Sequence, residues 1–370
     1  MFTRYNLKIV KSHVLYNNVG IKHNIKNCFS NISGGKYALD IGGTLIKLVY
    51  TINSKEQIML REEVTSFNKY CDYMNINENN NNNAEIFPSS SILFCLIPIN
   101  DVDIIEQIEN VFGFLIERGL YVINDTVSMT GGGSVKYKTL IENKYKIYIS
   151  HFEEVSGIVM GYFKLFENEK FNKYFNYLIN NEKNEISLKN DAIFSHSLLL
   201  PTLIVSVGSG ISIIKVENKD KFERIDGTRF GGGTIYGLGK LLGINSYKEL
   251  INVYKQTNNP NDNSFEDSSK CCYFKEILFA NLNNNSLKFK EKAVNDIINL
   301  MFSDLSYLLC LLLLRHKIRN IVFCGNNVSS NYDIIVKSIK KHSSFLIKDD
   351  VSIFFHHLDG FFGAIGACFS

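Results

Sequence analysis

The segment "YALDIGGTLIKLVY", Tyr37 to Tyr50, decides the fold that this sequence predicts. Two apolar arms enclose a short polar stretch that contains an acid, two glycines, a threonine and a lysine. Aliphatic arms favour strands, and glycine supplies the positive φ angles and the close backbone approach that a tight connection needs. The segment therefore predicts a β-hairpin with polar groups at its turn.

A second segment, "LIVSVGSGISIIKV" (Leu203 to Val216), has the same plan. When Asp40 is aligned with Ser206, Gly42 falls over Gly208 and the apolar arms fall over one another. Further along each half, a helix, an apolar strand and a glycine turn are expected in that order. We therefore expect an α/β fold of two similar lobes that face each other across a cleft, with ligands bound at the carboxyl ends of strands.

Spacing defines several of these elements. In the first half, four apolar residues are expected on the buried face of a helix: Ile105, Ile108, Phe112 and Leu115. In the second half, the strand is expected at Asn320 to Cys324, followed by a glycine turn. The longest apolar run, Leu305 to Leu314, is shorter than the roughly 18 to 20 residues of a membrane span, so we expect a buried core helix and no span.

The polar groups of the first hairpin suit a phosphate site. Backbone N–H groups in glycine-rich turns form a concave anion site. Gly42 and Gly43 would let the backbone approach the phosphates of ATP, and Thr44 would add a hydroxyl. Lys47 would neutralise charge on the transferred group, and Asp40 would hold Mg²⁺ through water, because magnesium keeps much of its hydration shell. A single hairpin of this kind is also compatible with a plain turn, but its repetition favours the phosphate interpretation.

Other glycine turns extend this site. In "RFGGGTIYGLGKLLG" (Arg229 to Gly243), a triple glycine leads into an apolar helix, whose N-terminus carries partial positive charge. The segment "TGGGSVKYKTLIE" (Thr130 to Glu142) has the same character. Six further glycines are predicted to contact ATP: Gly131, Gly132, Gly208, Gly231, Gly232 and Gly325.

Composition limits the alternatives. The chain has 370 residues, with 40 Lys and Arg against 37 Asp and Glu, so its formal net charge is +3. This small excess does not indicate a nucleic-acid binder. Its eight cysteines are scattered without a CxxC pair, so the sequence predicts neither a zinc site nor a disulfide framework. We expect a reducing compartment, the cytoplasm.

Some segments fall outside the predicted lobes. Residues 1–35 are basic and lack acids, so we expect a poorly ordered extension, with an organellar targeting signal as the alternative. Three stretches rich in polar residues, 73–91, 167–191 and 256–270, are expected to be surface insertions, because they cannot bury enough apolar surface to offset backbone entropy.

Six motifs together resemble one family, the type II (eukaryotic-type) pantothenate kinases of the actin, sugar-kinase and chaperone ATPase superfamily. In chain order they are "DIGGTLIKLVY", "MTGGGSVKYK", "VSVGSGISIIKV", "RIDGTRFGGGT", "VFCGN" and "LDGFFGAIGA". The resemblance implies two actin-like (ribonuclease H-like) lobes with mixed sheets. The N-terminal lobe would span residues 36–150, and the C-terminal lobe would span residues 151–370 with the substrate site and the dimer interface.

The resemblance also implies roles for individual residues. The family's catalytic carboxylate lies in an acidic pair followed by an apolar stretch and a glycine, a pattern that "FEEVSGIVMG" meets with Glu154. By the same resemblance, Ser209, Ser212 and Arg224 would bind pantothenate and an overlapping feedback ligand, CoA or an acyl-CoA. The chain departs from the family pattern at Arg229, at Ser156, and in the C-terminal His-Glu-Gly motif, which is Leu358, Asp359 and Gly360 here.

The resemblance therefore predicts an ATP- and Mg²⁺-dependent kinase that converts pantothenate to 4'-phosphopantothenate, the first step of coenzyme A biosynthesis, under feedback by CoA thioesters. Two alternatives stay open. The chain could be a non-catalytic or co-catalytic subunit of a heteromeric pantothenate kinase, or a kinase of another small hydroxylated substrate. Family members are dimers, so we expect a homodimer or a heterodimer with a homologue.

Overall fold

The structure is a computed structural model, and it describes the following residues: 37–43, 45–53, 90–98, 104–117, 123–166, 174–190, 199–257, 289–326, 328, 331–356 and 358–369. The chain forms two compact units, residues 1–173 with 360–370 and residues 174–359. The expected boundary after residue 150 differs from this division. Helix α5 (Glu154–Phe166) belongs to the first unit because it packs against the C-terminal helix α11 (Phe362–Phe369), which in turn contacts strands of the first sheet.

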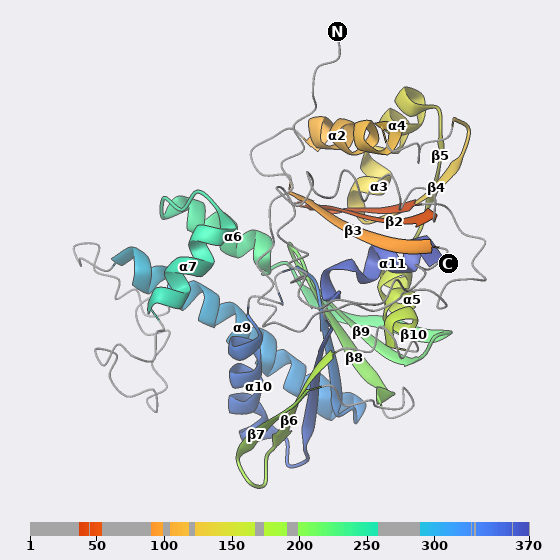
Figure 1. The fold of residues 1–370 in the computed structure, drawn as a ribbon. Helices are drawn as coiled ribbons and strands as arrows, with labels where there is room; N and C mark the ends of the chain where they lie inside the picture. Colours follow the sequence, from red (N-terminus) through yellow and green to blue (C-terminus); the bar gives the residue numbers. More distant parts are fainter. Residues whose placement is uncertain are drawn as a thin grey trace, which may run out of the picture. The chain divides into compact units, whose positions relative to one another are not determined.

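The first unit contains a five-stranded sheet in the order β3-β2-β1-β4-β5 (Figure 1). Its strands are β1 (Tyr37–Ile41), β2 (Leu45–Asn53), β3 (Ser90–Pro98), β4 (Thr126–Thr130) and β5 (Tyr148–His151). Strands β1 to β3 are antiparallel neighbours, whereas β4 pairs in parallel with both β1 and β5. The sheet is therefore mixed, with a hairpin at one side and parallel strands at the other.

The second unit repeats this plan in a seven-stranded sheet of order β10-β9-β8-β11-β12-β6-β7. Its strands are β6 (Tyr174–Asn180), β7 (Glu185–Asn190), β8 (Thr202–Val207), β9 (Ile211–Asn218), β10 (Lys221–Thr228), β11 (Asn320–Cys324) and β12 (Val351–His356). Strands β8, β9 and β10 are antiparallel neighbours, and β11 is parallel to β8 and β12, as in the first sheet. This duplication confirms the predicted α/β fold with two lobes built on mixed sheets.

One part of the second sheet was not expected. Strands β6 and β7 form a hairpin that pairs antiparallel with β12, within the polar stretch that was predicted to be an insertion. The prediction was wrong for residues 174–190, because their pairing with a strand from the far end of the chain is a tertiary interaction. The basic segment 1–35, Thr44, and most of the other two polar stretches lie outside the described residues.

Alternation along the strands decides which side chains face the helices in the first unit. Leu39 and Ile41 of β1 belong to a hydrophobic core that also contains Phe112. Asp40 points to the opposite face, toward α11. Figure 1 shows α2, α3 and α4 on one face of this sheet and α11 on the other. The remaining helices of this unit are α2 (Ile104–Glu117), α3 (Gly132–Lys136) and α4 (Lys138–Tyr145).

In the second unit, one face of the sheet packs against helices in a large hydrophobic core. These helices are α6 (Gly232–Leu241), α7 (Tyr247–Thr257), α9 (Phe289–His316) and α10 (Tyr332–Leu346). Helix α9 is much longer than the apolar run that predicted it, and its residues Lys290–His316 are long and apolar enough to cross a membrane by length and composition. Half of its most apolar stretch is buried, as in a core helix.

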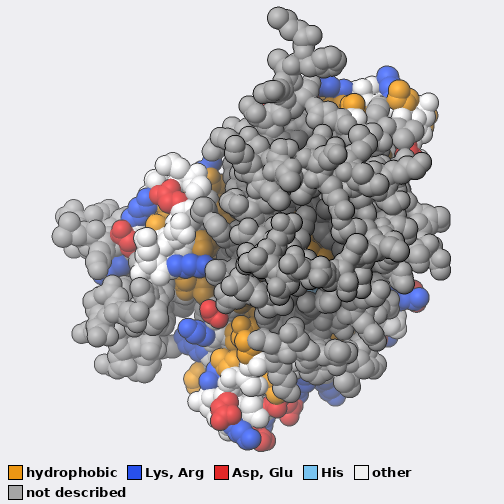
Figure 2. All heavy atoms as spheres, viewed as in Figure 1, with side chains coloured by type: hydrophobic (Ala, Val, Ile, Leu, Met, Phe, Trp, Pro, Cys, Tyr) orange, Lys and Arg blue, Asp and Glu red, His pale blue; other side chains and the backbone are white. Residues whose placement is uncertain are grey.

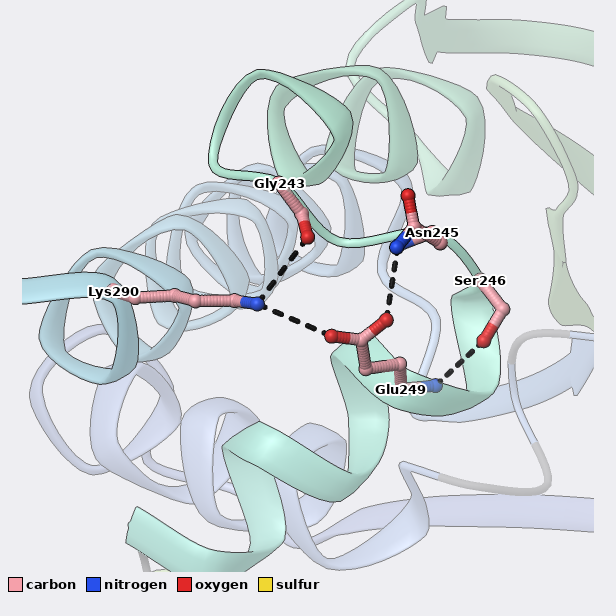
Figure 3. Close-up of polar contacts among 5 residues, drawn as sticks. All are labelled: Gly243, Asn245, Ser246, Glu249 and Lys290. Carbon is pink, nitrogen blue, oxygen red and sulfur yellow. Dashed lines mark hydrogen bonds and ion pairs between the residues drawn. The ribbon is translucent and has the colours of Figure 1, made fainter.

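Polar contacts join α6, α7 and α9 at one corner of this unit (Figure 3). Oε2 of Glu249 accepts a hydrogen bond from the backbone N–H of Asn245 at 2.9 Å, and Oε1 accepts one from Nζ of Lys290 at 3.1 Å. Ser246 immediately precedes α7, and its Oγ accepts a hydrogen bond from the N–H of Glu249 at 3.1 Å. The carboxylate thus ties the start of α7 to the start of α9.

Charges of both signs are mixed on the surface of the described residues. On the face shown in Figure 2, Lys and Arg side chains lie among Asp and Glu side chains, which fits the formal net charge of +3. The described part of this face therefore resembles an ordinary protein surface rather than a dedicated polyanion-binding surface.

Candidate functional site

Asp40 is the centre of the polar group in the first unit. It is only 8% exposed, and its Oδ2 lies 2.7 Å from Nζ of Lys47, its cross-strand partner on β2. Cross-strand partners have their side chains on the same face of a sheet, so the register of the hairpin produces this ion pair. The structure thus brings together the two charged residues that the sequence assigned to the phosphate site.

Glycines enclose the carboxylate of Asp40. A Cβ at Gly131 would lie 2.6 Å from Oδ1 of Asp40, and Gly131 also has a φ of +80°, which a side chain would strain. A Cβ at Gly363 would lie 3.2 Å from Oδ2 of the same carboxylate. The turn after β4 and the start of α11 therefore both approach Asp40 closely. A side chain at Gly131 would collide with its surroundings, whereas one at Gly363 would require a small shift of Asp40.

The turn of the first hairpin is compact. The N–H of Gly42 donates to the carbonyl oxygen of Leu45 at 2.9 Å, so this amide is used within the turn. Gly43 is exposed, and a Cβ there would meet no atom within 4 Å. Gly132 is likewise exposed, with open space where a Cβ would be. The backbone of Gly43 and Gly132 is therefore accessible to a ligand.

The sequence did not predict two residues beside the glycine turn that follows β4. The buried Ser134 donates from its Oγ to the carbonyl oxygen of Gly131 at 2.7 Å, and it lies 2.8 Å from Nδ1 of His151. The direction of the second hydrogen bond depends on the tautomer of His151. The pair links the glycine turn to the end of β5. No spacing rule joins these two residues, so only the fold could reveal the contact.

The two acids at the start of α5 have different surroundings. Glu153 accepts hydrogen bonds from the N–H groups of Val155 and Ser156, at 3.0 and 2.6 Å, and so caps the helix. Partial burial acts to raise the pKa of Glu153, but the hydrogen bonds from Ser156 and Val155 outweigh it and hold the pKa below its usual value. Glu154 is an exposed residue of the first helical turn. Glu153 is therefore a helix cap, and the role of Glu154 as the base stays a prediction.

In the second unit, the hairpin turn packs directly on the start of α6. The N–H groups of Gly232 and Gly233 donate to the carbonyl oxygens of Gly208 and Ser209, both at 3.0 Å. A Cβ at Gly231 would lie 2.8 Å from the Cα of Gly210. These glycines let two backbone segments touch, and the N–H of Gly232 is used inside the protein. Phosphate contacts by Gly208, Gly231 and Gly232 stay a prediction.

Gly325 ends β11 next to the second hairpin. It has a φ of +114°, and a Cβ there would lie 2.3 Å from the carbonyl oxygen of Val207. Its N–H donates to the carbonyl oxygen of Asp359 at 3.0 Å. The structure therefore gathers the predicted glycine turns of each unit at the ends of that unit's own strands.

Two of the predicted substrate residues lie together in the second unit. Ser212 is the register partner of Gly227, and a Cβ at Gly227 would lie 2.6 Å from Nη2 of Arg224. A register shift between Arg224 and Asp226 lets the guanidinium fold back along β10 toward Gly227. Ser209 is exposed at the hairpin turn, beside Gly233. Arg224 and Ser212 thus both lie beside Gly227.

The residues around Asp40 fit a hydrated Mg²⁺. Among the described residues, no three His, Cys, Asp or Glu side chains gather as a metal cluster. Magnesium does not need such a cluster, because it often binds through one carboxylate, several waters and the phosphates of its nucleotide. Asp40, enclosed by glycines and exposed to only a small extent, is a suitable carboxylate.

Similar proteins include a 4'-phosphopantetheine phosphatase of Mus musculus, 26% identical over 358 residues, which are 92% of this chain and 41% of that protein. Pantothenate kinase 1 of Arabidopsis thaliana is 33% identical over 230 residues, which are 60% of this chain and 52% of that protein. The chain therefore spans about half, or less, of the length of these relatives.

Among solved structures, a ROK family glucokinase from Streptomyces griseus in complex with glucose and AMPPNP is 11% identical, with a TM-score of 0.44 over 90% of this chain and 98% of that chain. A glucokinase from Balamuthia mandrillaris in complex with glucose is 13% identical, with a TM-score of 0.42 over 92% of this chain and 95% of that chain. Similarity at this level supports no inference about function.

One protein family, described as Fumble, matches residues 36–370. The match includes both duplicated sheets, all of the glycine turns described above and the helix that carries Glu154. The chain belongs to the Fumble family of type II pantothenate kinase-like proteins.

Proposed function

We propose that this chain is a pantothenate kinase, which transfers the γ-phosphoryl group of ATP to the terminal hydroxyl of pantothenate. The product is 4'-phosphopantothenate, the first intermediate of coenzyme A biosynthesis. Membership of the Fumble family and similarity to pantothenate kinases of plants support the proposal. The observation that carries it in this chain is the Asp40–Lys47 pair, enclosed by Gly131 and Gly363 at the end of β1.

The proposed chemistry is a direct in-line transfer. The hydroxyl oxygen of pantothenate attacks the γ-phosphorus, the bond from that phosphorus to the leaving oxygen of ADP breaks, and Glu154 accepts the hydroxyl proton. Glu154 must be ionised for this role. Glu154 is an exposed residue at the start of α5, beside the helix cap Glu153.

The residues of the first unit have separate proposed tasks. Lys47 would shift its ammonium from Asp40 toward the transferred phosphoryl group, whose charge it would stabilise. Gly43 and Gly132 would offer accessible backbone to the phosphates. Mg²⁺ bound with ATP would supply charge neutralisation between the phosphate oxygens. Asp40 would orient the waters of that ion.

The residues of the second unit would bind the acceptor. Pantothenate has a carboxylate, an amide and hydroxyls, which suit a guanidinium and fixed hydroxyl groups. Arg224, folded back beside Gly227, would bind the carboxylate, and Ser209 and Ser212 would bind the polar groups. The same residues would bind CoA or an acyl-CoA as a feedback inhibitor. A homodimer or heterodimer, and a cytoplasmic location, complete the proposal.

One observation favours a second candidate. A relative that aligns over 92% of this chain has a name that describes a phosphatase, and this chain spans only 41% of its length. A non-catalytic or co-catalytic subunit of a heteromeric enzyme is therefore the alternative to an active kinase. A kinase of another small hydroxylated substrate is the further alternative within the same chemistry.

A substrate panel distinguishes these functions. The purified chain is mixed with ATP, Mg²⁺ and either pantothenate, glucose or glycerol, and ADP release is measured with and without acetyl-CoA. Release of phosphate from 4'-phosphopantetheine is measured in parallel. We expect ADP release with pantothenate but not with glucose or glycerol, and we expect acetyl-CoA to reduce it. Turnover that appears only when a second homologue is added would support the subunit alternative, and release of phosphate alone would contradict the kinase.

A further inference from the structure

Thr130, the last residue of β4, has a buried hydroxyl beside Asp40. The two residues are register partners in the parallel β1–β4 pair, so their side chains lie on the same face of the sheet. Thr130 is 0% exposed. Its Oγ1 is among the few buried side-chain polar atoms of the described residues that have no hydrogen-bond partner in the protein.

This arrangement is unfavourable unless the hydroxyl has a use. A hydroxyl that is buried without a partner loses its hydrogen bonds to water, whereas valine has nearly the same shape and carries no such cost. The methyl group of Thr130 faces Gly363, where an added Cβ would lie 3.5 Å from its Cγ2. Packing therefore accounts for the methyl group and leaves the hydroxyl unexplained.

The neighbours of the hydroxyl indicate its partner. Asp40 presents its carboxylate on the same face of the sheet as Thr130, and both side chains lie beside Gly363, whose Cβ would be 3.2 Å from Oδ2 of Asp40 and 3.5 Å from Cγ2 of Thr130. A hydroxyl can donate one hydrogen bond and accept two. A water molecule that also contacts a carboxylate would satisfy it, and the hydration shell of a divalent cation provides such waters in fixed positions.

We propose that Thr130 is a positioning residue that fixes a water in the hydration shell of a divalent cation bound through Asp40. The inference rests on the proposed function, because that function supplies the Mg²⁺–nucleotide complex. Thr130 would act on the cation through water and would not touch the reacting phosphorus. Its hydroxyl would hold one of these waters in a fixed position relative to Asp40.

Two substitutions separate the hydroxyl from the methyl group. Thr130→Val keeps the shape and removes the hydroxyl, and Thr130→Ser keeps the hydroxyl and removes the methyl group that faces Gly363. Each protein is examined in two ways that need no turnover. The melting temperature is measured without ligand, and the affinity for ADP is measured by calorimetry in Mg²⁺, in Mn²⁺ and in EDTA.

We expect Thr130→Val to melt at the temperature of the wild type or above it, because an unsatisfied hydroxyl has been removed. We expect its metal-dependent gain in ADP affinity to be smaller than that of the wild type by about 10-fold to 100-fold, the usual effect of losing an outer-shell partner. Its ADP affinity in EDTA should be unchanged. Thr130→Ser should melt at a lower temperature and keep the metal-dependent gain.

The opposite pattern would overturn the inference. A Thr130→Val protein that melts earlier than the wild type, and keeps the full metal-dependent gain, would show that the hydroxyl supports only the fold. A wild type whose ADP affinity is the same in Mg²⁺ and in EDTA would also overturn it. A protein that binds ADP with Mg²⁺ but does not phosphorylate pantothenate would contradict the proposed substrate and leave the role of Thr130 supported.

Discussion

Gly366 of α11 lies against the carbonyl oxygen of Gly157 in α5, so closely that a Cβ on Gly366 would be 1.9 Å from that oxygen. Gly161 meets α11 in the same way, since its Cβ would lie 2.0 Å from the carbonyl oxygen of Phe362. The two helices therefore touch through their backbones. This contact holds the helix that begins at Glu154 against the helix whose first turn approaches Asp40.

Replacement of Gly366 by alanine should strongly destabilise the first unit. The new methyl group would overlap a backbone atom, which cannot move aside as a flexible side chain can. We expect Gly366→Ala to lower the free energy of unfolding by about 3 kcal/mol or more, measured by urea denaturation. Gly237→Ala is the matched control, because Gly237 is an exposed helical glycine with no atom within 4 Å of a Cβ.

The control should change in the opposite direction. Alanine in the exposed interior of a helix is more favourable than glycine by about 0.5 to 1 kcal/mol. Equal effects of the two substitutions, or a Gly366→Ala protein as stable as the wild type, would contradict the backbone contact between α5 and α11.

Loss of Lys47 should cost more than loss of an exposed lysine. Lys47→Met leaves the carboxylate of Asp40 buried without its cation, so we expect the free energy of unfolding to fall by about 2 to 3 kcal/mol. Lys144→Met is the control, because Lys144 forms an exposed ion pair with Glu109: the two side chains are 46% and 39% exposed. Exposed pairs contribute less than about 1 kcal/mol.

A double-mutant cycle tests the pair directly. If Asp40 and Lys47 interact as described, Asp40→Asn combined with Lys47→Met should destabilise by less than the sum of the two single substitutions. The free energies of unfolding of all four proteins are compared by urea denaturation at neutral pH. Simple additivity would show that the ammonium and the carboxylate do not interact in solution.

Glu249 predicts a pH dependence of stability in the second unit. Hydrogen bonds from the N–H of Asn245 and from Lys290 hold the pKa of Glu249 below its ordinary value of 4.5. A carboxyl with a depressed pKa in the folded state stabilises the protein above the unfolded pKa, and this contribution is lost as pH falls through the folded pKa. Stability from this contact should therefore be complete near neutral pH and absent in strong acid.

The substitution Glu249→Gln checks this sign. We expect the melting temperature to fall at pH 7 and the difference from the wild type to shrink as the pH is lowered below 4.5. Glu182→Gln, at an exposed carboxylate in the β6–β7 turn, should change little at either pH. If the difference in melting temperature between Glu249→Gln and the wild type is constant with pH, the charge of Glu249 does not contribute to stability.

Local patterns predicted much of the fold. The helical spacing placed Ile108, Phe112 and Leu115 in the core of the first unit, where they are buried. The strand Asn320–Cys324 has the predicted bounds, and both hairpins form where the glycines interrupt apolar arms. These features depend on periodicity and turn chemistry, which are properties of short segments.

Tertiary pairing set the limits of the prediction. The two hairpin loops differ by one residue, since Ile41 pairs with Ile46 whereas Val207 pairs with Ile211. Ser212 pairs with Ser206 as Lys47 pairs with Asp40, so Ser212 is the structural counterpart of Lys47. An alignment of the two segments without gaps cannot find this correspondence. Strands β6 and β7 were missed because they pair with β12, a strand from the far end of the chain.

The candidate site was predicted in part. Sequence reasoning chose Asp40 and Lys47, and their contact follows from one hairpin register. It could not find the approach of Gly363 to Asp40, because these residues come from opposite ends of the described chain. It also could not find the buried hydroxyl of Thr130, since burial without a partner is a property of the assembled unit.

The central claim, that Glu154 is the base of a pantothenate kinase, is tested most directly by the turnover of Glu154→Gln. Glu153→Gln is the matched control, because it makes the same chemical change at the neighbouring residue, which caps α5. Initial rates of 4'-phosphopantothenate formation are measured with saturating ATP and pantothenate. We expect kcat to fall by about 10² to 10⁴ in Glu154→Gln, the usual contribution of a general base, and to stay close to wild type in Glu153→Gln. A Glu154→Gln enzyme that works at the wild-type rate would contradict the account.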